Sequence, residues 1–116
     1  MRLRKLISNA HAFRNERDWK QYHSSRNVAL SVVLEAAELL EIFQWKSDRE
    51  CEELLNDPAV RQNISDELAD IFLYILLMAD DLDIDLVEAA ERKMKKNAEK
   101  YPVAKAKGKA LKYNQL

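Results

Sequence analysis

The segment "DELADIFLYILLMA", residues 66–79, decides the class of fold. Its second part, residues 71–79, carries no charge and is apolar around the whole circumference of a helix. Such a helix is buried on all sides, but this run is too short to span a bilayer. The helices of one short chain cannot easily surround one of their own number. We therefore predict an all-α, four-helix-bundle-type fold that is completed by oligomerisation, as a homodimer or homotetramer with no membrane partner.

The rest of the chain fits one helical domain over residues 1–116, ending in a basic tail over about residues 103–116. One Gly and two Pro among 116 residues leave few helix breakers. Apolar residues recur at helical spacing in the long segments between the polar loops. We expect four long helices, over about residues 3–16, 25–43, 58–81 and 86–100.

Capping signals mark where these helices begin. Ser24 or Ser25 suits the N-cap of the second helix. An Asp followed by Pro, as in Asp57–Pro58, is typical of an N-cap and the first helical residue. Two further pairs have capping-box spacing, and the first of them predicts a short extra helix: Ser47 with Glu50, and Asp85 with Glu88.

Charge is unevenly distributed, although the net charge is only −1. Residues 92–116 hold nine of the 19 basic residues and one of the 20 acids, so they carry +8 and residues 1–91 carry −9. This asymmetry suggests cations bound by the body and an anionic ligand met by the tail, the alternative being a solvated Lys-rich terminus. The single Cys51 cannot form an internal disulfide, which fits a reducing compartment and predicts the cytoplasm.

Two of the predicted helices carry acids three residues apart at the border of their apolar stripe. Glu35 and Glu38 lie in "LEAAELLEIFQW", and Glu67 and Asp70 lie in the segment quoted first. If the helices pack antiparallel, the pairs face each other. Each like-charged pair at ~4 Å then costs on the order of 4 kcal/mol at an effective dielectric constant of ~20. Glu41 continues the first series but rotates away from the stripe, so we expect it in solvent.

Protonation or a divalent cation would relieve this repulsion, and carboxylate oxygens suit Mg²⁺ or Mn²⁺. Di-iron bundles need Glu-x-x-His on two helices, and neither His11 nor His23 follows a Glu by three residues. The alternative for each acid pair alone is a solvated helix face.

The order of the motifs resembles the MazG-like, all-α nucleoside triphosphate pyrophosphohydrolases. The acids form the pattern E-x-x-E, 28 residues, E-x-x-D. Leu34 stands where the broader family often has another Glu, which we interpret as a mark of the dCTP-pyrophosphatase branch. Further stretches are similar to that branch: "ERDWKQYHSSRN" (16–27), "FQWKSD" (43–48), "DELADIFLYIL" (66–76), K-x-x-x-N-x-x-x-Y-P (93–102) and "KYNQL" (112–116).

This resemblance implies Mg²⁺-dependent hydrolysis of a nucleoside triphosphate to the monophosphate and pyrophosphate, with Mn²⁺ as a possible substitute. The implied substrate is dCTP or a related deoxynucleotide, and the implied role is house-cleaning or nucleotide-pool control. The metal ligands would be the four acids, and Glu38 would orient or deprotonate the attacking water. The residues implied as metal ligands are Glu35, Glu38, Glu67 and Asp70.

A nucleotide also needs contacts for its base, sugar and phosphates. Aromatic faces stack on bases, and an aromatic ring beside the metal would exclude a 2′-hydroxyl; the alternative for each ring is a core or interface anchor. The candidates for base and sugar are Phe13, Trp19, His23, Trp45 and Tyr74. Basic and polar groups suit phosphates, with a solvated tail as the alternative. These candidates are Arg26, Lys93, Asn97, Tyr101, Lys109, Lys112 and Tyr113.

Two other classes of function compete with this enzyme. The first is a non-catalytic helical interaction module that oligomerises and carries the acids as surface charges; metal dependence separates it from the enzyme. The second is a nucleic-acid binder that uses the tail. Nucleic acid would then meet a body of charge −9, so we expect no nucleic-acid partner.

Overall fold

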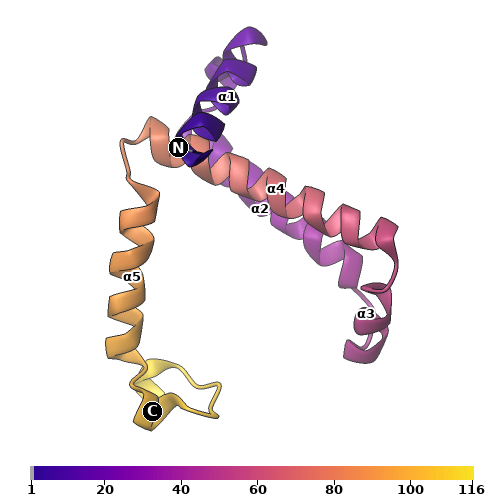
Figure 1. Ribbon diagram of the computed structural model, residues 1–116, viewed down its shortest axis with the longest axis vertical. Coiled ribbons are helices and arrows are strands. Elements are labelled where there is room, and N and C mark those ends of the chain that lie inside the picture. Colours follow the sequence, from indigo (N-terminus) through magenta and orange to yellow (C-terminus); the bar gives the residue numbers. More distant parts are fainter. Residues whose placement is uncertain (1) are drawn as a thin grey trace. The chain divides into compact units, whose positions relative to one another are not determined.

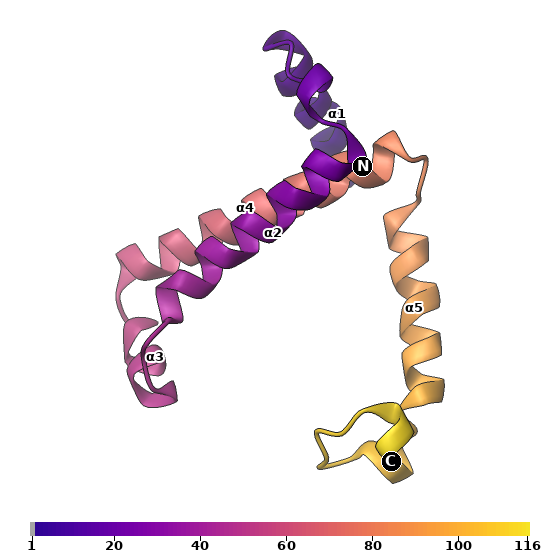
Figure 2. The same cartoon turned by 180° about the vertical axis from the view of Figure 1, so that it is seen from behind.

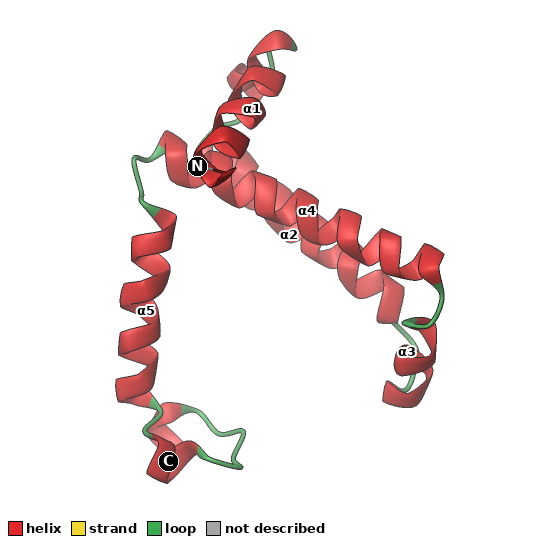
Figure 3. Cartoon of the chain, in the orientation of Figure 1, coloured by secondary structure: helices red, strands yellow, loops and turns green. Residues whose placement is uncertain are grey.

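Helices form all the regular structure of the part of the chain that the computed structural model describes, residues 2–116 (Figures 1 and 3). The all-α prediction is therefore confirmed. The chain divides into two units, residues 1–82 and residues 83–116. A single domain over the whole chain stays a prediction.

The first unit contains the first three predicted long helices and the predicted short one. Their bounds agree with the predicted ranges to within a residue, because apolar periodicity and caps are local signals. A 3₁₀ turn, Lys20–Tyr22, bridges the first two. The helices are α1 (Arg2–Glu16), α2 (Ser25–Phe43), α3 (Asp48–Leu54) and α4 (Pro58–Asp81).

Helices α2 and α4 lie side by side and run antiparallel, as both views of the ribbon show (Figures 1 and 2). Helix α1 packs on α4. The predicted caps form, since the Ser24 hydroxyl accepts from the Asn27 backbone N–H at 3.2 Å and the Asp57 carboxylate from that of Ala59 at 2.9 Å. The antiparallel pair is the arrangement that the two acid pairs require in order to meet.

Helix α3 turns the chain from α2 into α4, and its predicted capping box is confirmed. The Glu50 backbone N–H donates to the Ser47 hydroxyl, and the Ser47 backbone N–H donates to the Glu50 carboxylate, each at 3.2 Å. Trp45 precedes this box with a φ of 66°, which is uncommon for a residue other than Gly.

The apolar core of the first unit lies between α2 and α4. Val28, Leu76, Leu77 and Ala79 are its buried apolar residues. The segment predicted to be buried on all sides is covered only in part by its own chain, because Phe72 keeps 42% of its surface exposed. The predicted partner chain therefore stays a prediction.

The second unit contains α5 (Leu86–Lys100), a short helix α6 (Val103–Ala106) and a 3₁₀ turn over Tyr113–Gln115. Asp85 caps α5 by accepting from the Glu88 backbone N–H at 3.1 Å. The Glu88 carboxylate lies 3.6 Å from Arg92 Nη1, so it pairs along the helix rather than back to the cap. No helix within residues 2–116 has the length and apolar character to cross a membrane.

Candidate functional site

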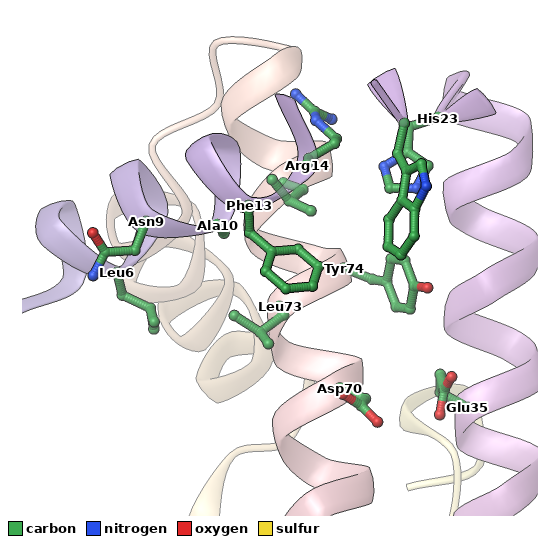
Figure 4. Close-up of a pocket in the computed structure, with 12 residues that line it drawn as sticks. Leu6, Asn9, Ala10, Phe13, Arg14, His23, Glu35, Asp70, Leu73 and Tyr74 are labelled. Carbon is green, nitrogen blue, oxygen red and sulfur yellow. The ribbon is translucent and has the colours of Figure 1, made fainter. Parts of the chain in front are cut away.

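The antiparallel packing of α2 and α4 brings the predicted acids together. Glu35, Glu38 and Glu67 each offer a carboxylate oxygen within 4.8 Å of the oxygens of the other two. The fourth predicted ligand, Asp70, lies on α4 across from Glu35 on α2 (Figure 4). We call these four residues the acid cluster.

The acid cluster repels negative charge within itself. Burial raises the pKa of Glu35 to about 7, and the neighbouring carboxyl groups of Glu67, Glu38 and Asp70 add to this. The Oε2 atoms of Glu35 and Glu67 are buried without a hydrogen-bond partner. Two unpartnered buried carboxylate oxygens beside further carboxylates are a set of hard donors that fits a divalent cation.

A pocket of about 460 Å³ extends from the acid cluster between α1, α2 and α4. Glu35 and Asp70 line one part of it, and Tyr74 lies between these acids and His23 (Figure 4). The His23 and Tyr74 rings meet edge to face, with centroids 6.2 Å apart. The pocket thus passes from carboxylates to aromatic rings over a few turns of helix.

Helix α1 and the loop after it supply the aromatic wall of the pocket. The Phe13 and Trp19 rings form an edge-to-face pair with centroids 5.8 Å apart, and both line the pocket. These two residues and the ring pair of His23 and Tyr74 were predicted as nucleotide contacts, and the fold brings all four rings to one cavity. We call Phe13 and Trp19 the aromatic wall.

His23 brings a polar atom to this pocket. Burial lowers the pKa of His23, and the positive charge of Arg14 lowers it further, so the imidazole is neutral at neutral pH. Its Nδ1 is buried without a hydrogen-bond partner. A neutral imidazole with an unused nitrogen can donate to or accept from a bound molecule.

An ion pair between a buried arginine and a partly exposed aspartate at the other side of the pocket was not predicted from the sequence. The Arg14 side chain is 1% exposed, and its Nη1 and Nη2 donate to the two carboxylate oxygens of Asp81 at 2.8 and 2.9 Å. Hydrogen bonding with Asp81 raises the pKa of Arg14, and hydrogen bonding with Arg14 lowers that of Asp81. The available signal was a charged residue on the apolar stripe of the first helix, seven residues after Ile7.

Several predicted site residues lie away from the pocket lining. Trp45 is 92% exposed beyond the end of α2, and Arg26 is exposed on the first turn of that helix. Their roles stay predictions. The roles of the residues in the second unit also stay predictions. There the Tyr101 and Tyr113 rings meet edge to face, and Lys100 Nζ lies 4.9 Å from the Tyr113 ring centroid. The predicted phosphate contacts in that unit are Lys93, Asn97, Tyr101, Lys109, Lys112 and Tyr113.

Comparisons with known proteins agree with this geometry. The chain is 41% identical over 111 residues to dCTP pyrophosphatase 1 of Mus musculus and 39% identical over 111 residues to that of Homo sapiens, covering 95% of this chain. It spans only 65% of the length of these curated relatives. A crystal structure of a pyrophosphatase from Archaeoglobus fulgidus superposes with a TM-score of 0.82 at 40% identity, covering 88% of this chain and 94% of that one.

The model of one protein family covers most of the chain. It is the MazG-like family model, which matches residues 30–116 and so includes all four members of the acid cluster. The match, the helical fold and the paired acids lead to one conclusion, that the chain belongs to the MazG-like family.

Proposed function

We propose that the chain is a Mg²⁺-dependent nucleoside triphosphate pyrophosphohydrolase that cleaves a (d)NTP to the monophosphate and pyrophosphate. We propose dCTP or a related deoxynucleotide as the preferred substrate, and house-cleaning or nucleotide-pool control in the cytoplasm as the role. One observation carries the proposal: the acid cluster, with an unpartnered carboxylate oxygen on Glu35, stands at one part of a pocket that aromatic rings also line. The names of the similar proteins support the reaction and the substrate.

The acid cluster would hold the cation. When bound there, a divalent ion neutralises the triphosphate and lowers the pKa of water in its coordination shell. Mn²⁺ takes the same oxygen donors and is the expected substitute. Within the cluster, Glu35 and Glu67 are half-buried and Glu38 is exposed. The two half-buried acids would therefore hold the ion on its buried side, and Glu38 would hold it on the solvent side.

Glu38 is the proposed catalytic carboxylate. Its exposed side chain can reach a water molecule from solvent, orient it toward the α-phosphorus and accept its proton as pyrophosphate leaves. Glu35 is a poorer choice, because its half-buried carboxylate is less open to a water molecule from solvent than that of Glu38.

The rest of the pocket suits a nucleoside. Tyr74 follows Asp70 by about one helical turn and lies where a sugar next to the α-phosphate would sit (Figure 4). A 2′-hydroxyl against this ring would lose its hydrogen bonds to water. Beyond Tyr74, the ring faces of Trp19 can stack on a base while His23 offers a polar contact.

We further propose that the chain acts as a homodimer or homotetramer. Large apolar side chains on α2 and α4 are exposed in the single chain, and such patches are typical of interaction surfaces. Static light scattering at micromolar concentration should give at least twice the monomer mass, and a stable monomer would contradict this. The exposed residues are Leu30, Val33, Leu34, Leu40, Leu68 and Phe72.

The decisive experiment measures pyrophosphate release from a panel of canonical and modified (d)NTPs with Mg²⁺, with Mn²⁺ and with EDTA. We expect one pyrophosphate per monophosphate, no turnover in EDTA, and dCTP or a close relative among the best substrates. Absence of hydrolysis with every nucleotide and both metals, from a folded oligomer, would favour the non-catalytic interaction module instead.

A further inference from the structure

We infer that Arg14 and Asp81, together with His11 and Asp80, form a clasp that positions the aromatic wall of the pocket and thereby tunes its selectivity for the base. This inference rests on the proposed function, because it assigns the residues that position the base-binding part of that same site. None of the four residues belongs to the acid cluster.

The clasp is a continuous chain of polar contacts between α1 and the end of α4. Both terminal nitrogens of Arg14 donate to the Asp81 carboxylate, at 2.8 and 2.9 Å. The Nη2 atom of Arg14 also lies 2.8 Å from His11 Nδ1. A guanidinium only donates, so Nδ1 accepts and the ring proton resides on Nε2. That nitrogen lies 2.5 Å from Asp80 Oδ2, to which it donates. With this tautomer, His11 connects Asp80 through Arg14 to Asp81.

The clasp attaches α1 to α4 at the buried residue of that helix. Arg14 is the buried residue of that helix, whereas the buried apolar residues of the core lie on α2 and α4. The apolar side chains of α1 that face the pocket remain partly exposed, with Leu6 at 37% and Phe13 at 50%. Apolar packing of these side chains leaves part of their surface open, and the directed Arg14–Asp81 bonds add a constraint on the orientation of α1 on α4.

Three residues of α1 that line the pocket close to Arg14 depend on its position. Asn9, Ala10 and Phe13 lie on the same stretch of helix as Arg14, and the Phe13 ring contacts Trp19 edge to face. Figure 4 shows the Phe13 ring projecting from α1 into the space beside Tyr74. A small rotation of α1 moves this wall toward or away from Tyr74 and changes the width available to a base.

Arg14 acts through position and not by binding phosphate. Its two terminal nitrogens are engaged by Asp81 and His11, and Figure 4 shows the guanidinium directed away from Glu35 and Asp70. A bidentate Arg–carboxylate pair fixes orientation as well as distance, which a Lys ammonium at the same place cannot do. The conservative Arg14→Lys variant therefore separates geometry from charge.

The test compares Arg14→Lys, Asp81→Asn and Asp80→Asn with Arg4→Lys, an exposed residue of the same helix, as the control. Each full-length protein is titrated with dCMP and with dTMP by tryptophan fluorescence, and kcat and KM are measured for dCTP and dTTP at saturating Mg²⁺. Binding of the monophosphates needs no hydrolysis. A wild type that binds dCMP selectively but hydrolyses nothing would overturn the proposed function and leave the clasp testable.

We expect Arg14→Lys and Asp81→Asn to raise the Kd for dCMP and the KM for dCTP roughly tenfold, with kcat changed less than about twofold, because a displacement of an ångström or less weakens a positioned contact. The ratio of the Kd for dTMP to the Kd for dCMP should fall toward one, and so should the ratio of the KM for dTTP to the KM for dCTP. Asp80→Asn, which cuts only the His11 arm, should give a smaller change in the same direction. Arg4→Lys should match the wild type.

Folded variants whose Kd and KM ratios between the two bases equal those of the wild type would overturn the inference. So would variants that lose kcat in proportion to their unfolded fraction while KM stays unchanged. If Asp81→Asn fails to fold, the Kd ratio for the two monophosphates and the KM ratio for the two triphosphates in Arg14→Lys and Asp80→Asn decide whether the inference holds.

Discussion

Helix α4 presents carboxylates in two opposite settings. Near its middle, Glu67 and Asp70 face the acids of α2, and the pKa of Glu35 there is raised to about 7. At its end, Asp81 faces Arg14, and that pairing lowers the pKa of Asp81. The carboxylates of the first setting repel one another, and a bound cation would relieve that repulsion, whereas the carboxylate of the second setting is paired within the chain. The contrast separates acids kept for a ligand from acids kept for the fold.

The helix dipole sharpens this contrast. Carboxylates in the last turn of a helix face the partial negative charge of its C-terminal carbonyls, which is unfavourable. Asp80 and Asp81 occupy that turn of α4. Their partners His11 and Arg14 on α1 offset this repulsion, so the end of α4 depends on the presence of α1.

The largest expected effect comes from removing the charge of one member of the acid cluster. Glu38→Gln should lower kcat by on the order of a thousandfold while leaving the free energy of unfolding unchanged or raised, since it removes a proton acceptor and a repulsive charge. Pyrophosphate release at saturating Mg²⁺ measures the first effect and urea unfolding the second. Glu41→Gln, one turn along the same helix and exposed as predicted, is the matched control. Near wild-type turnover in Glu38→Gln would remove it from the catalytic role.

The reverse pattern is expected for the clasp. Asp81→Asn should lower the free energy of unfolding by about 3 kcal/mol, because it leaves the guanidinium of Arg14 buried without its countercharge. Mg²⁺ affinity, measured by calorimetry, should stay within about twofold, because the acid cluster is untouched. Asp83→Asn, in the exposed turn that follows, is the control. A loss of Mg²⁺ affinity equal to that of an acid-cluster variant would show that the two settings are coupled.

Tyr74 lies between the two settings and tests the sugar contact. If the ring excludes a 2′-hydroxyl at ~1–3 kcal/mol, the wild type should prefer dCTP to CTP by roughly tenfold to a hundredfold in kcat/KM. Tyr74→Ala should narrow that gap more than it alters the ranking of dCTP, dATP and dTTP. Tyr22→Ala, an exposed aromatic residue outside the pocket lining, is the control. Equal use of CTP and dCTP by the wild type would refute the sugar contact.

The smallest expected effect is the pH dependence of the metal-free protein. A folded pKa for Glu35 of about 7, above the ordinary 4.5, means that the folded state binds its proton more tightly than the unfolded state does. Stability in EDTA should therefore fall as pH rises from about 4.5 to 7 and stay lower above that, by a few degrees in Tm. Glu35→Gln should flatten this dependence. The prediction would be wrong if the change in Tm between pH 5 and pH 8, measured in EDTA, were the same for the wild type and for Glu35→Gln.

Local sequence signals predicted most of the fold. The caps at Ser24, Ser47 and Asp57 and the apolar periodicity fixed the helix bounds, because each depends on residues within one or two turns. The acid cluster was also predictable, since equal spacing on two helices and antiparallel packing suffice to bring the carboxylates together.

The clasp and the position of Trp45 were not predictable in the same way. Arg14 and Asp81 are 67 residues apart, and no local rule relates them. Trp45 follows α2 closely in sequence, but the chain turns at that residue with a φ of 66° and leaves the indole in solvent. Contacts of these kinds depend on how helices pack and how loops turn, which periodicity does not specify.

The acid cluster and the aromatic wall come from different helices, and this separation bears on how such a chain can evolve. The acids of the cluster come from α2 and α4, whereas the aromatic wall comes from α1 and the loop that follows it. Substitutions along α1 can therefore accumulate without touching the acid cluster, to which we assign the chemistry, provided that Arg14 keeps its partner. Under the proposed function, a change of nucleotide preference then needs substitutions in α1 and its following loop alone, and the acids of α2 and α4 stay as they are.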